Sequence, residues 1–418
     1  MSKIIQKKRV VITGLGLCSP IGNSLDEVAT ALAEERHGIA RMADWDRVGQ
    51  LATRLAAPVH GVERSDFPRK KIRTMGRVAL LAAYASDRAL HDAGLADIDL
   101  SSGRVGLAYG STHGSTSELE TYARTVFTNN SLAGLESTGY LTFMSHTCAA
   151  NLAMYYGIQG RIITTCSACV SASQAIGYGY EAVAEGKQDV MVCGGAEELH
   201  FTHAGIFDIM YATSTKYNDN PELSPRPFDA GRDGLVVGEG AATVILESYD
   251  RAVARGAKIY AEILGYGTNC DGQHITRPSW EGMAGAMKLA LQDAEIPADQ
   301  VDYVNAHGTA TSEGDPVEIA ALKAVFGHHA ERLAVSATKS MHGHLLGAVG
   351  AMEALITVLA LARQEIPPTA HLEEVAEECQ GVRHVMGVGL TGMSFKSAVS
   401  NSFAFGGSNA VLAFRAVS

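Results

Sequence analysis

Cys169 is the residue of this 418-residue chain whose setting most favours covalent chemistry. It follows a strand-like run at 161–165 and precedes an apolar helical pattern, with small residues on both sides. Backbone N–H groups and the dipole at a helix start stabilise a thiolate and lower the pKa of a thiol. A buried structural thiol is the competing interpretation. Cys166 completes a Cys-x-x-Cys spacing, which leaves a redox pair as a third possibility.

Two histidines stand where a catalytic role is plausible from the pattern. His307 follows the strand-like run 301–305 and projects from its carboxyl end, where α/β sheets bind ligands. Thr309 and Thr311 come next, with both hydroxyls on one side of an extended segment, which suits a polar chain lying alongside. A satisfied histidine in a polar loop is the alternative for His307. His344 lies just before an apolar helical stretch.

Two further patterns suggest a metal or a nucleotide cofactor, and both are incomplete. His342 and His344 have the spacing of two metal ligands, but no cysteine or carboxylate cluster at ligand spacing accompanies them. We therefore predict no metal and interpret His344 as a second catalytic imidazole. Gly14-x-Gly16 follows a strand, but Ser19 occupies the third glycine position of a dinucleotide-binding loop. The sequence thus disfavours a nicotinamide enzyme.

Glu353 lies within the helical stretch 345–362, where apolar residues cover most of the helix circumference. A helix that is apolar on nearly all faces is buried, and a buried carboxylate is costly unless it is paired. Lys339, on the preceding turn, is the nearest cation in the sequence. We predict a buried Lys339–Glu353 pair, which is either purely structural or sets the protonation of nearby histidines.

The elements that must position these residues alternate between strand and helix. Strand-like runs occur at 9–13, 105–109, 190–193, 242–247, 260–265, 301–305, 333–336 and 410–414, and helical patterns at 73–93, 170–185, 281–294, 315–326 and 345–362. This alternation is typical of an α/β protein with largely parallel, buried sheets. Segments 161–185 and 333–362 repeat one plan of strand, small-residue turn and apolar helix. We therefore expect one compact body, built from two similar halves.

Charge and composition narrow the range of functions. The net charge of −11 argues against nucleic-acid binding, which needs a broad positive surface. The first 77 residues nevertheless carry 14 Lys and Arg against 8 Asp and Glu, a net of +6, which suits an acidic partner. The seven cysteines lie in apolar or glycine-rich stretches, and the N-terminus has no signal-peptide pattern. The apolar stretch 345–361 is interrupted and too short to span a bilayer. These features predict a cytoplasmic protein without a membrane span.

Jointly, the motifs resemble the elongating β-ketoacyl-acyl-carrier-protein synthases, which are condensing enzymes of the thiolase superfamily. The resemblance runs end to end and rests on segments 11–16, 167–169, 189–197, 226–234, 238–240, 306–311, 339–347 and 401–407. It implies a thiolase-type α/β fold of five layers, α-β-α-β-α, made from two similar halves. We place the half with the nucleophilic cysteine at 1–255 and the half with the two catalytic histidines at 256–418.

The resemblance also implies a role for each matching residue. The implied roles are nucleophile for Cys169, paired histidines for His307 and His344, supporting charges for Lys339 and Glu353, oxyanion hole and gate for Cys169 N–H and Phe405, and pantetheine binding for Thr309 and Thr311. The implied reaction is the decarboxylative Claisen condensation of an acyl chain with malonyl-acyl-carrier protein. No cofactor is needed, because phosphopantetheine of the carrier protein holds the substrates.

The family also includes non-catalytic subunits that only shape a tunnel for an active partner. Such a subunit is the alternative to a catalytic one, and the presence of Cys169, His307 and His344 argues against it. We expect a homodimer, or a heterodimer with a homologous subunit that resembles a chain-length factor.

Departures from the family pattern concern the acyl chain and the carrier protein. His113, His146 and Asn151 are candidate residues of the acyl tunnel, and His342 replaces a small residue. A more polar tunnel suits unsaturated, aryl-capped or polyketide-like chains, and parts of the sequence resemble ketosynthases of aryl-polyene clusters. The basic residues that we expect to dock the acidic carrier protein are Arg69, Lys70, Arg73 and Lys216.

Overall fold

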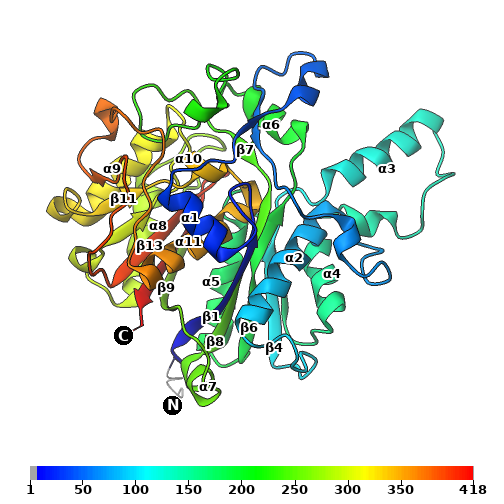
Figure 1. Ribbon diagram of the computed structural model, residues 1–418, viewed down its shortest axis with the longest axis horizontal. Coiled ribbons are helices and arrows are strands. Elements are labelled where there is room, and N and C mark those ends of the chain that lie inside the picture. Colours follow the sequence, from blue (N-terminus) through cyan, green and yellow to red (C-terminus); the bar gives the residue numbers. More distant parts are fainter. Residues whose placement is uncertain (1–6, 418) are drawn as a thin grey trace.

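One eleven-stranded sheet runs through the molecule, and the computed structural model describes it within residues 7–417 (Figure 1). The strands of its first half are β1 (Val10–Cys18), β4 (Val105–Gly110), β5 (Ile162–Thr165), β6 (Val190–Glu197) and β8 (Gly240–Ser248). Those of its second half are β9 (Ala261–Cys270), β10 (Tyr303–Asn305), β11 (Ala334–Ser336), β12 (Arg383–His384), β13 (Ser397–Phe403) and β14 (Ser408–Ala416). Every strand-like run in the sequence corresponds to one of these strands.

The two halves of the sheet repeat one topology. The order is β5-β4-β6-β8-β1 in the first half and β12-β11-β10-β13-β14-β9 in the second. Apart from the additional edge strand β12, the strands of each half appear in the same order: third, second, fourth, fifth and first along the chain. Strand directions repeat as well, with two parallel pairs followed by two antiparallel pairs. β1 and β9 join the halves as an antiparallel pair. The prediction of two similar halves is therefore confirmed, while the proposed division at residue 255 stays a prediction.

The prediction of largely parallel strands is wrong for the middle of the sheet. Strand pairs are parallel towards both edges but antiparallel from β6 across to β13. One cause is the short turn at 404–407 between β13 and β14, because so short a connection allows only a hairpin and a parallel pair needs a crossover.

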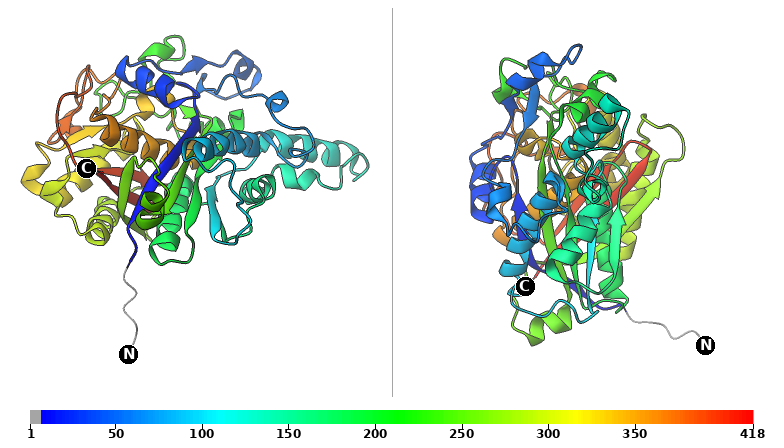
Figure 2. Two further views of the ribbon diagram at one scale, coloured as in Figure 1. Left: turned by 60° about the horizontal axis from the view of Figure 1, so that its bottom comes forward. Right: turned by 90° about the vertical axis from the view of Figure 1, so that its right-hand side faces the viewer.

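Helices fill three layers around the sheet (Figures 1 and 2). α2 (Arg77–Asp92) and α4 (Thr147–Tyr156) pack on the strands of the first half, and α8 (Trp280–Ala294) packs on those of the second together with α9 (Gly314–Phe326). α5 (Ser171–Ala184) and α11 (Val349–Arg363) pack against each other, and each contacts strands of both halves. Because the two halves of the sheet form two β layers with α5 and α11 between them, the arrangement is the predicted five-layered α-β-α-β-α sandwich.

α11 corrects one sequence-based argument. With the 3₁₀ turn before it, this helix forms an 18-residue apolar segment, Leu346–Arg363, long and apolar enough to cross a membrane. Residues 349–361 are nevertheless all buried in the sandwich. The segment is therefore a core helix because it is buried. Its length does not exclude a membrane span, although the sequence-based argument relied on length.

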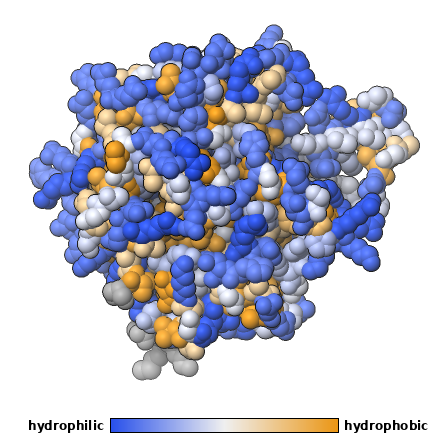
Figure 3. Space-filling model, viewed as in Figure 1, coloured by the Kyte–Doolittle hydropathy of each residue, from blue (hydrophilic) through white to orange (hydrophobic). Residues whose placement is uncertain are grey.

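Several shorter elements lacked a clear pattern in the sequence. They are α3 (Thr116–Asn129), α6 (Phe201–Asp208), α7 (Tyr249–Ala254), α10 (Lys339–His342), and a small sheet of β2 (Ala40–Arg41), β3 (Leu55–Ala57) and β7 (Val237–Gly238). In contrast, α1 (Leu25–Ala33) begins after a recognisable N-cap, because the Ser24 side chain accepts the Glu27 N–H. α3 has no buried residue and projects from the body (Figure 1). Orange patches mark its far end in Figure 3, where Phe127 is 81% and Leu132 71% exposed.

Candidate active site

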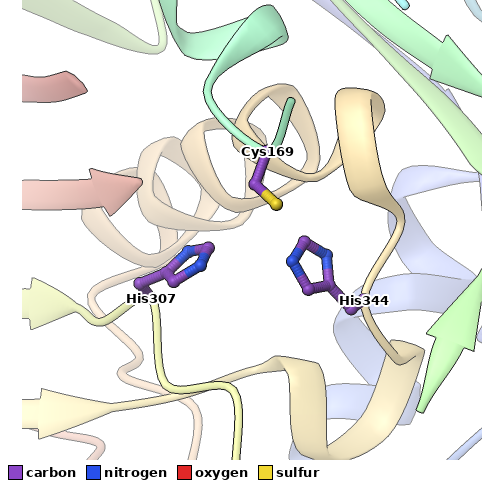
Figure 4. A group of neighbouring side chains, drawn as sticks. All are labelled: Cys169, His307 and His344. Carbon is purple, nitrogen blue, oxygen red and sulfur yellow. The ribbon is translucent and has the colours of Figure 1, made fainter. Parts of the chain in front are cut away.

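Three side chains from separate parts of the chain meet between the two halves of the fold. Sγ of Cys169 and one ring nitrogen each of His307 and His344 lie within 4.8 Å of one another (Figure 4). Cys169 lies between β5 and α5, His307 follows β10, and His344 follows β11 and the single turn of α10. The predicted positions of all three are confirmed, and all three are buried.

A tight turn presents the Cys169 side chain. Ala168 adopts a left-handed conformation with φ of 48°, which is uncommon for a residue other than glycine. The Ser171 hydroxyl accepts a hydrogen bond from Ser167 N–H and donates one to the Ala168 carbonyl. The Thr112 hydroxyl donates to the same carbonyl over 3.3 Å. This network holds a strained backbone turn, as is common where a side chain must be aimed at a reaction site.

The protonation of Cys169 differs from the sequence-based expectation. Burial raises the pKa of its thiol to about 12, and the positive charge of Lys339 opposes that rise without cancelling it. Although α5 begins two residues later, desolvation of the thiolate outweighs the favourable helix dipole. The resting group is therefore a neutral thiol, which must lose its proton during the reaction.

Both histidines are neutral and carry their proton on the same ring atom. Burial, and next the charge of Lys339, lower the pKa of His307 and of His344 well below the ordinary value. Nδ1 of His344 accepts a hydrogen bond from Leu346 N–H over 3.1 Å, and Nδ1 of His307 lies 3.3 Å from the Lys339 ammonium, which donates to it. In each neutral ring the proton must then sit on Nε2. The site therefore holds two Nε2–H donors, from rings whose centroids are 5.4 Å apart.

The buried ion pair expected from the sequence is present. Nζ of Lys339 lies 2.5 Å from Oε1 of Glu353, and both side chains are almost completely buried. Burial raises the pKa of Glu353 to about 7, and Lys339 counters that rise. The pair keeps the Lys339 ammonium beside His307, while the imidazole itself stays neutral.

Two carboxylates on α9 support the site and had no role in the sequence-based interpretation. Glu318 accepts hydrogen bonds from the backbone N–H groups of His307 and Gly308, and from the Asn401 amide. Asp315 accepts the N–H groups of the next two residues, at 309 and 310. Both are buried on α9, where the only other charged residue is the exposed Lys323. A carboxylate among mostly apolar helical residues also marked Glu353, so a similar argument could have found them.

A cavity of about 460 Å³ leads to the three side chains. Thr309 and Thr311 line it, with their hydroxyls 2.9 Å apart, and so does Phe405, which is 38% exposed. Within residues 7–417, the backbone N–H groups of Cys169 and Phe405 donate no hydrogen bond to another backbone group. Both N–H groups therefore remain available to a ligand oxygen, as an oxyanion hole requires.

The structure does not bring the other candidate residues to this cavity. His146 is exposed, and the Asn151 amide is buried in hydrogen bonds with Thr74. His113 is half-buried and stacks on His203 instead. None of the three candidates lines the cavity in the described chain. Their role in an acyl tunnel stays a prediction.

His342 is buried in the core, whereas Cys166 lies at the surface. Nδ1 of His342 lies 2.7 Å from the Gly343 carbonyl, and Nε2 lies 3.0 Å from the Thr338 hydroxyl, so both nitrogens are engaged within the core. All seven cysteines lie in the described residues and are free thiols. Cys166 is exposed whereas Cys169 is buried.

The basic candidates for docking divide between two places. Arg69, Lys70 and Arg73 are exposed on a segment whose Ile72 packs into the same core cluster as α4. Lys216 is also exposed, and its backbone N–H bonds to Asp233, which lines the cavity. Of these four residues, only Lys216 is hydrogen-bonded to a residue that lines the cavity.

Cys169, His307 and His344 also form a donor set of the kind zinc prefers. A metal-binding histidine usually donates its second ring N–H to an oxygen, which leaves the other nitrogen free to ligate. Here Nδ1 of each ring faces a donor, a backbone N–H or an ammonium, so each Nε2 is protonated. This hydrogen bonding opposes metal binding.

A thiol facing two imidazole N–H donors, beside two free backbone N–H groups in a doubled α/β fold, defines a class of condensing enzymes that work through a thioester. The chain belongs to the β-ketoacyl synthase family. The family's N-terminal domain matches residues 7–252, and its C-terminal domain matches residues 260–373.

Relatives match along nearly the whole chain. The "3-oxoacyl-[acyl-carrier-protein] synthase 1" of Haemophilus influenzae is 38% identical over 98% of this chain and 99% of its own. A crystal structure of a β-ketoacyl synthase from Burkholderia phymatum has a TM-score of 0.94 and 48% identity, over 98% of this chain and 100% of that one.

Two polyketide-type structures are similar as well. The ishigamide ketosynthase/chain length factor has a TM-score of 0.91 and 30% identity, over 99% of this chain and 100% of that one. A ketosynthase in complex with its type II PKS acyl-carrier protein has a TM-score of 0.89 and 29% identity, with the same coverage.

Proposed function

We propose that this chain catalyses the decarboxylative Claisen condensation of an acyl group with malonyl-acyl-carrier protein, giving β-ketoacyl-acyl-carrier protein and carbon dioxide. One observation carries the proposal: Cys169, His307 and His344 lie within 4.8 Å of one another, and both rings are Nε2–H donors. The names of the curated relatives state the same substrate carrier.

In the first step, Cys169 takes the acyl group from the phosphopantetheine thioester of the carrier protein. The sulfur attacks the thioester carbonyl, whose oxygen accepts the free N–H groups of Cys169 and Phe405. The carbon–sulfur bond to pantetheine breaks, and the cysteine proton ends on the departing thiol. Because the Cys169 thiol begins protonated and the pantetheine thiol ends protonated, the step needs no net proton.

In the second step, a malonyl thioester loses carbon dioxide. Its thioester oxygen develops the enolate charge, which the Nε2–H groups of His307 and His344 stabilise. The enolate carbon attacks the acyl-Cys169 carbonyl and expels the cysteine sulfur, which takes up one proton. A neutral imidazole suits this role because its N–H donates without losing the proton, and Lys339 disfavours the imidazolium form.

The substrates reach the site on a carrier protein, and the reaction uses no cofactor of its own. The hydroxyls of Thr309 and Thr311 face the cavity and suit the amides of the pantetheine arm. The exposed cations Arg69, Lys70 and Lys216 suit an acidic carrier. A cytoplasmic location fits the free cysteines.

The active form is a homodimer or a heterodimer with a homologous subunit. β5 ends the sheet, and three of its four residues are at least partly exposed. An open strand edge invites pairing with a second chain. Exposed apolar side chains on and just before α4, which contacts β5, extend the surface that a partner would cover: Tyr140, Met144 and Met154.

The pathway is fatty-acid elongation or the elongation of aryl-polyene or polyketide chains. Similarity to the two polyketide-type structures supports the second option. A non-catalytic subunit remains the alternative function, and the complete thiol–imidazole site favours catalysis.

Intact-mass spectrometry tests the proposal directly. Incubation with acyl-loaded carrier protein should add one acyl group to the wild-type chain and none to Cys169→Ala. Adding malonyl-carrier protein should then remove the adduct and yield an elongated product. Unmodified wild-type protein across saturated, polyenoic and aryl-capped chains would reject catalysis and favour the non-catalytic subunit.

A further inference from the structure

One buried histidine beside the active site, His342, has no role in the reaction steps described above. It is the last residue of the single turn α10, two positions before His344. The ring is completely buried, and burial, and next the charge of Lys339, lower its pKa to about 3. The imidazole is therefore neutral, so any contribution that it makes depends on its hydrogen bonds and not on charge.

The two hydrogen bonds of His342 fix its tautomer. A backbone carbonyl can only accept, so Nδ1, which lies 2.7 Å from the Gly343 carbonyl oxygen, must carry the ring proton. Nε2 then accepts the proton of the Thr338 hydroxyl, 3.0 Å away. This arrangement is the reverse of that in His307 and His344, whose Nδ1 atoms accept. The His342 ring therefore serves as a donor towards the active-site side of the turn.

The His342 imidazole joins the two ends of α10. Thr338 directly precedes Lys339, and Gly343 directly precedes His344, so both ends of the bridge adjoin residues of the active site. Backbone N–H groups that donate to the Thr338 and Lys339 carbonyls close the turn. A helical turn of four residues is unstable by itself, because nucleation fixes several residues for few hydrogen bonds. The side-chain bridge therefore adds a restraint that this short turn lacks.

The peptide group between Gly343 and His344 is held from both sides. Its N–H donates to the Val236 carbonyl over 2.7 Å, and its carbonyl oxygen accepts the Nδ1–H of His342. In the described chain, no backbone N–H donates to that carbonyl. Gly343 has φ of 71°, and glycine restrains its own backbone least of all residues. The hydrogen bonds at this peptide therefore set the direction in which the His344 ring projects into the site (Figure 4).

We propose that His342 is a positioning residue for the decarboxylation of the malonyl thioester, acting through the Gly343 carbonyl on His344. The inference rests on the function proposed above and adds a residue to it. In the acyl-transfer step, the oxyanion accepts the backbone N–H groups of Cys169 and Phe405 and needs no imidazole. The enolate of the second step needs the Nε2–H of His344, and a misplaced donor is costly to rate. Loss of the His342 donor should therefore slow the second step and spare the first.

Three substitutions at position 342 separate hydrogen bonding from packing. His342→Leu has a similar size and forms no hydrogen bond. His342→Asn can place an amide nitrogen where Nδ1 lies and so keeps a donor to Gly343, whereas His342→Gln reaches towards Thr338 and loses that donor. Decarboxylation of malonyl-carrier protein is measured in the Cys169→Gln background, and acylation of Cys169 is followed by intact mass.

The leucine and glutamine variants should decarboxylate about 10- to 100-fold more slowly, with KM for malonyl-carrier protein unchanged. Their rates of Cys169 acylation should stay at the wild-type value, and His342→Asn should keep most of its decarboxylation. His384→Leu is the matched control. It removes a ring bond of the same kind, to the Cys379 carbonyl over 2.8 Å, at a residue that does not line the cavity, and it should leave both rates unchanged.

An equal loss of both rates in His342→Leu would overturn the proposal and show that the residue is structural only. An unchanged decarboxylation rate would overturn it as well. If urea unfolding shows that leucine disturbs the fold, the asparagine and glutamine variants decide, and equal decarboxylation by these two would reject the role of the Gly343 bond. A chain with wild-type His342 that neither acylates Cys169 nor decarboxylates malonyl-carrier protein would instead reject the underlying function.

Discussion

Lys339 and Glu353 form a buried ion pair 2.5 Å long directly behind the imidazole of His307. The same ammonium lies 3.3 Å from Nδ1 of His307 and donates to the His307 carbonyl. One side chain thus orients the ring, selects its tautomer and disfavours its protonated form. The pair links the stability of the core to the chemistry of the site.

Replacing one partner of this pair should be far more damaging to stability than replacing both. Glu353→Leu leaves a buried lysine without its counter-ion, and we expect a loss of about 3–5 kcal/mol in the free energy of unfolding. Lys339→Met combined with Glu353→Leu should recover most of that loss, because apolar groups replace both charges. Urea unfolding measures both variants. A double variant no more stable than the single one would contradict this interpretation.

The same double variant separates stability from catalysis. It should remain impaired in malonyl decarboxylation, because Nδ1 of His307 has lost its donor and the Nε2–H tautomer is no longer selected. Wild-type decarboxylation rates in a refolded double variant would show that the lysine is structural only.

The rate of malonyl decarboxylation should not change as the pH falls below neutral. Burial and the charge of Lys339 lower the pKa of His307 and His344, so both stay neutral as the pH falls through about 6.5, where a free histidine gains a proton. Cys169→Gln isolates these rings, since it should retain malonyl decarboxylation without condensation. Protonation of Glu353, whose pKa is raised to about 7, would leave the Lys339 charge in place and both rings neutral, so we expect a constant decarboxylation rate between about pH 8 and about pH 5.5. Circular dichroism at each pH is the control for folding, and a half-loss near pH 6.5 would show ordinary histidine titration.

Zinc should bind the thiol–imidazole site poorly, despite a suitable donor set. Each Nε2 carries the ring proton because Nδ1 accepts a hydrogen bond. Zinc ligation through Nε2 would require that proton to leave Nε2. We expect stoichiometric zinc to produce no binding heat in calorimetry, and a chelator to leave turnover unchanged. Tight one-to-one binding that disappears in Cys169→Ala would refute this expectation.

Charge reversal at the basic segment should weaken carrier-protein recognition specifically. Arg69→Glu with Lys70→Glu should raise KM for carrier-bound substrates about tenfold at low salt and leave small thioester mimics unaffected, because steering acts on the acidic carrier. High salt should reduce the difference. Lys288→Glu, at an exposed position on α8, is the matched control. Equal effects on both kinds of substrate would show that the segment is not the docking surface.

Local patterns were sufficient for much of the fold. The strand before Cys169 and the all-apolar helix around Glu353 could be read from residue types, because burial leaves a signature in hydrophobicity. α3 escaped notice because none of its side chains is buried and it carries no core-facing stripe. Strand directions in the middle of the sheet escaped as well, since they depend on which strands become neighbours in space.

The residues of the site could likewise be predicted from the sequence, whereas their protonation states could not. Cys169, His307, His344 and the Lys339–Glu353 pair followed from positions at strand ends and in an apolar helix. The depth of burial decided the pKa of the thiol and reversed the direction expected from a helix start alone. The Nε2–H tautomers follow from a backbone N–H and an ammonium, which reach the two rings from residues 346 and 339.

By itself, the sequence determined the class of fold, the chemically competent residues and their family, because these reside in residue types and local spacing. Only the tertiary structure decided which groups face one another. Protonation depends on solvent exclusion and on neighbours distant in the chain. Those quantities exist only once the halves have packed together.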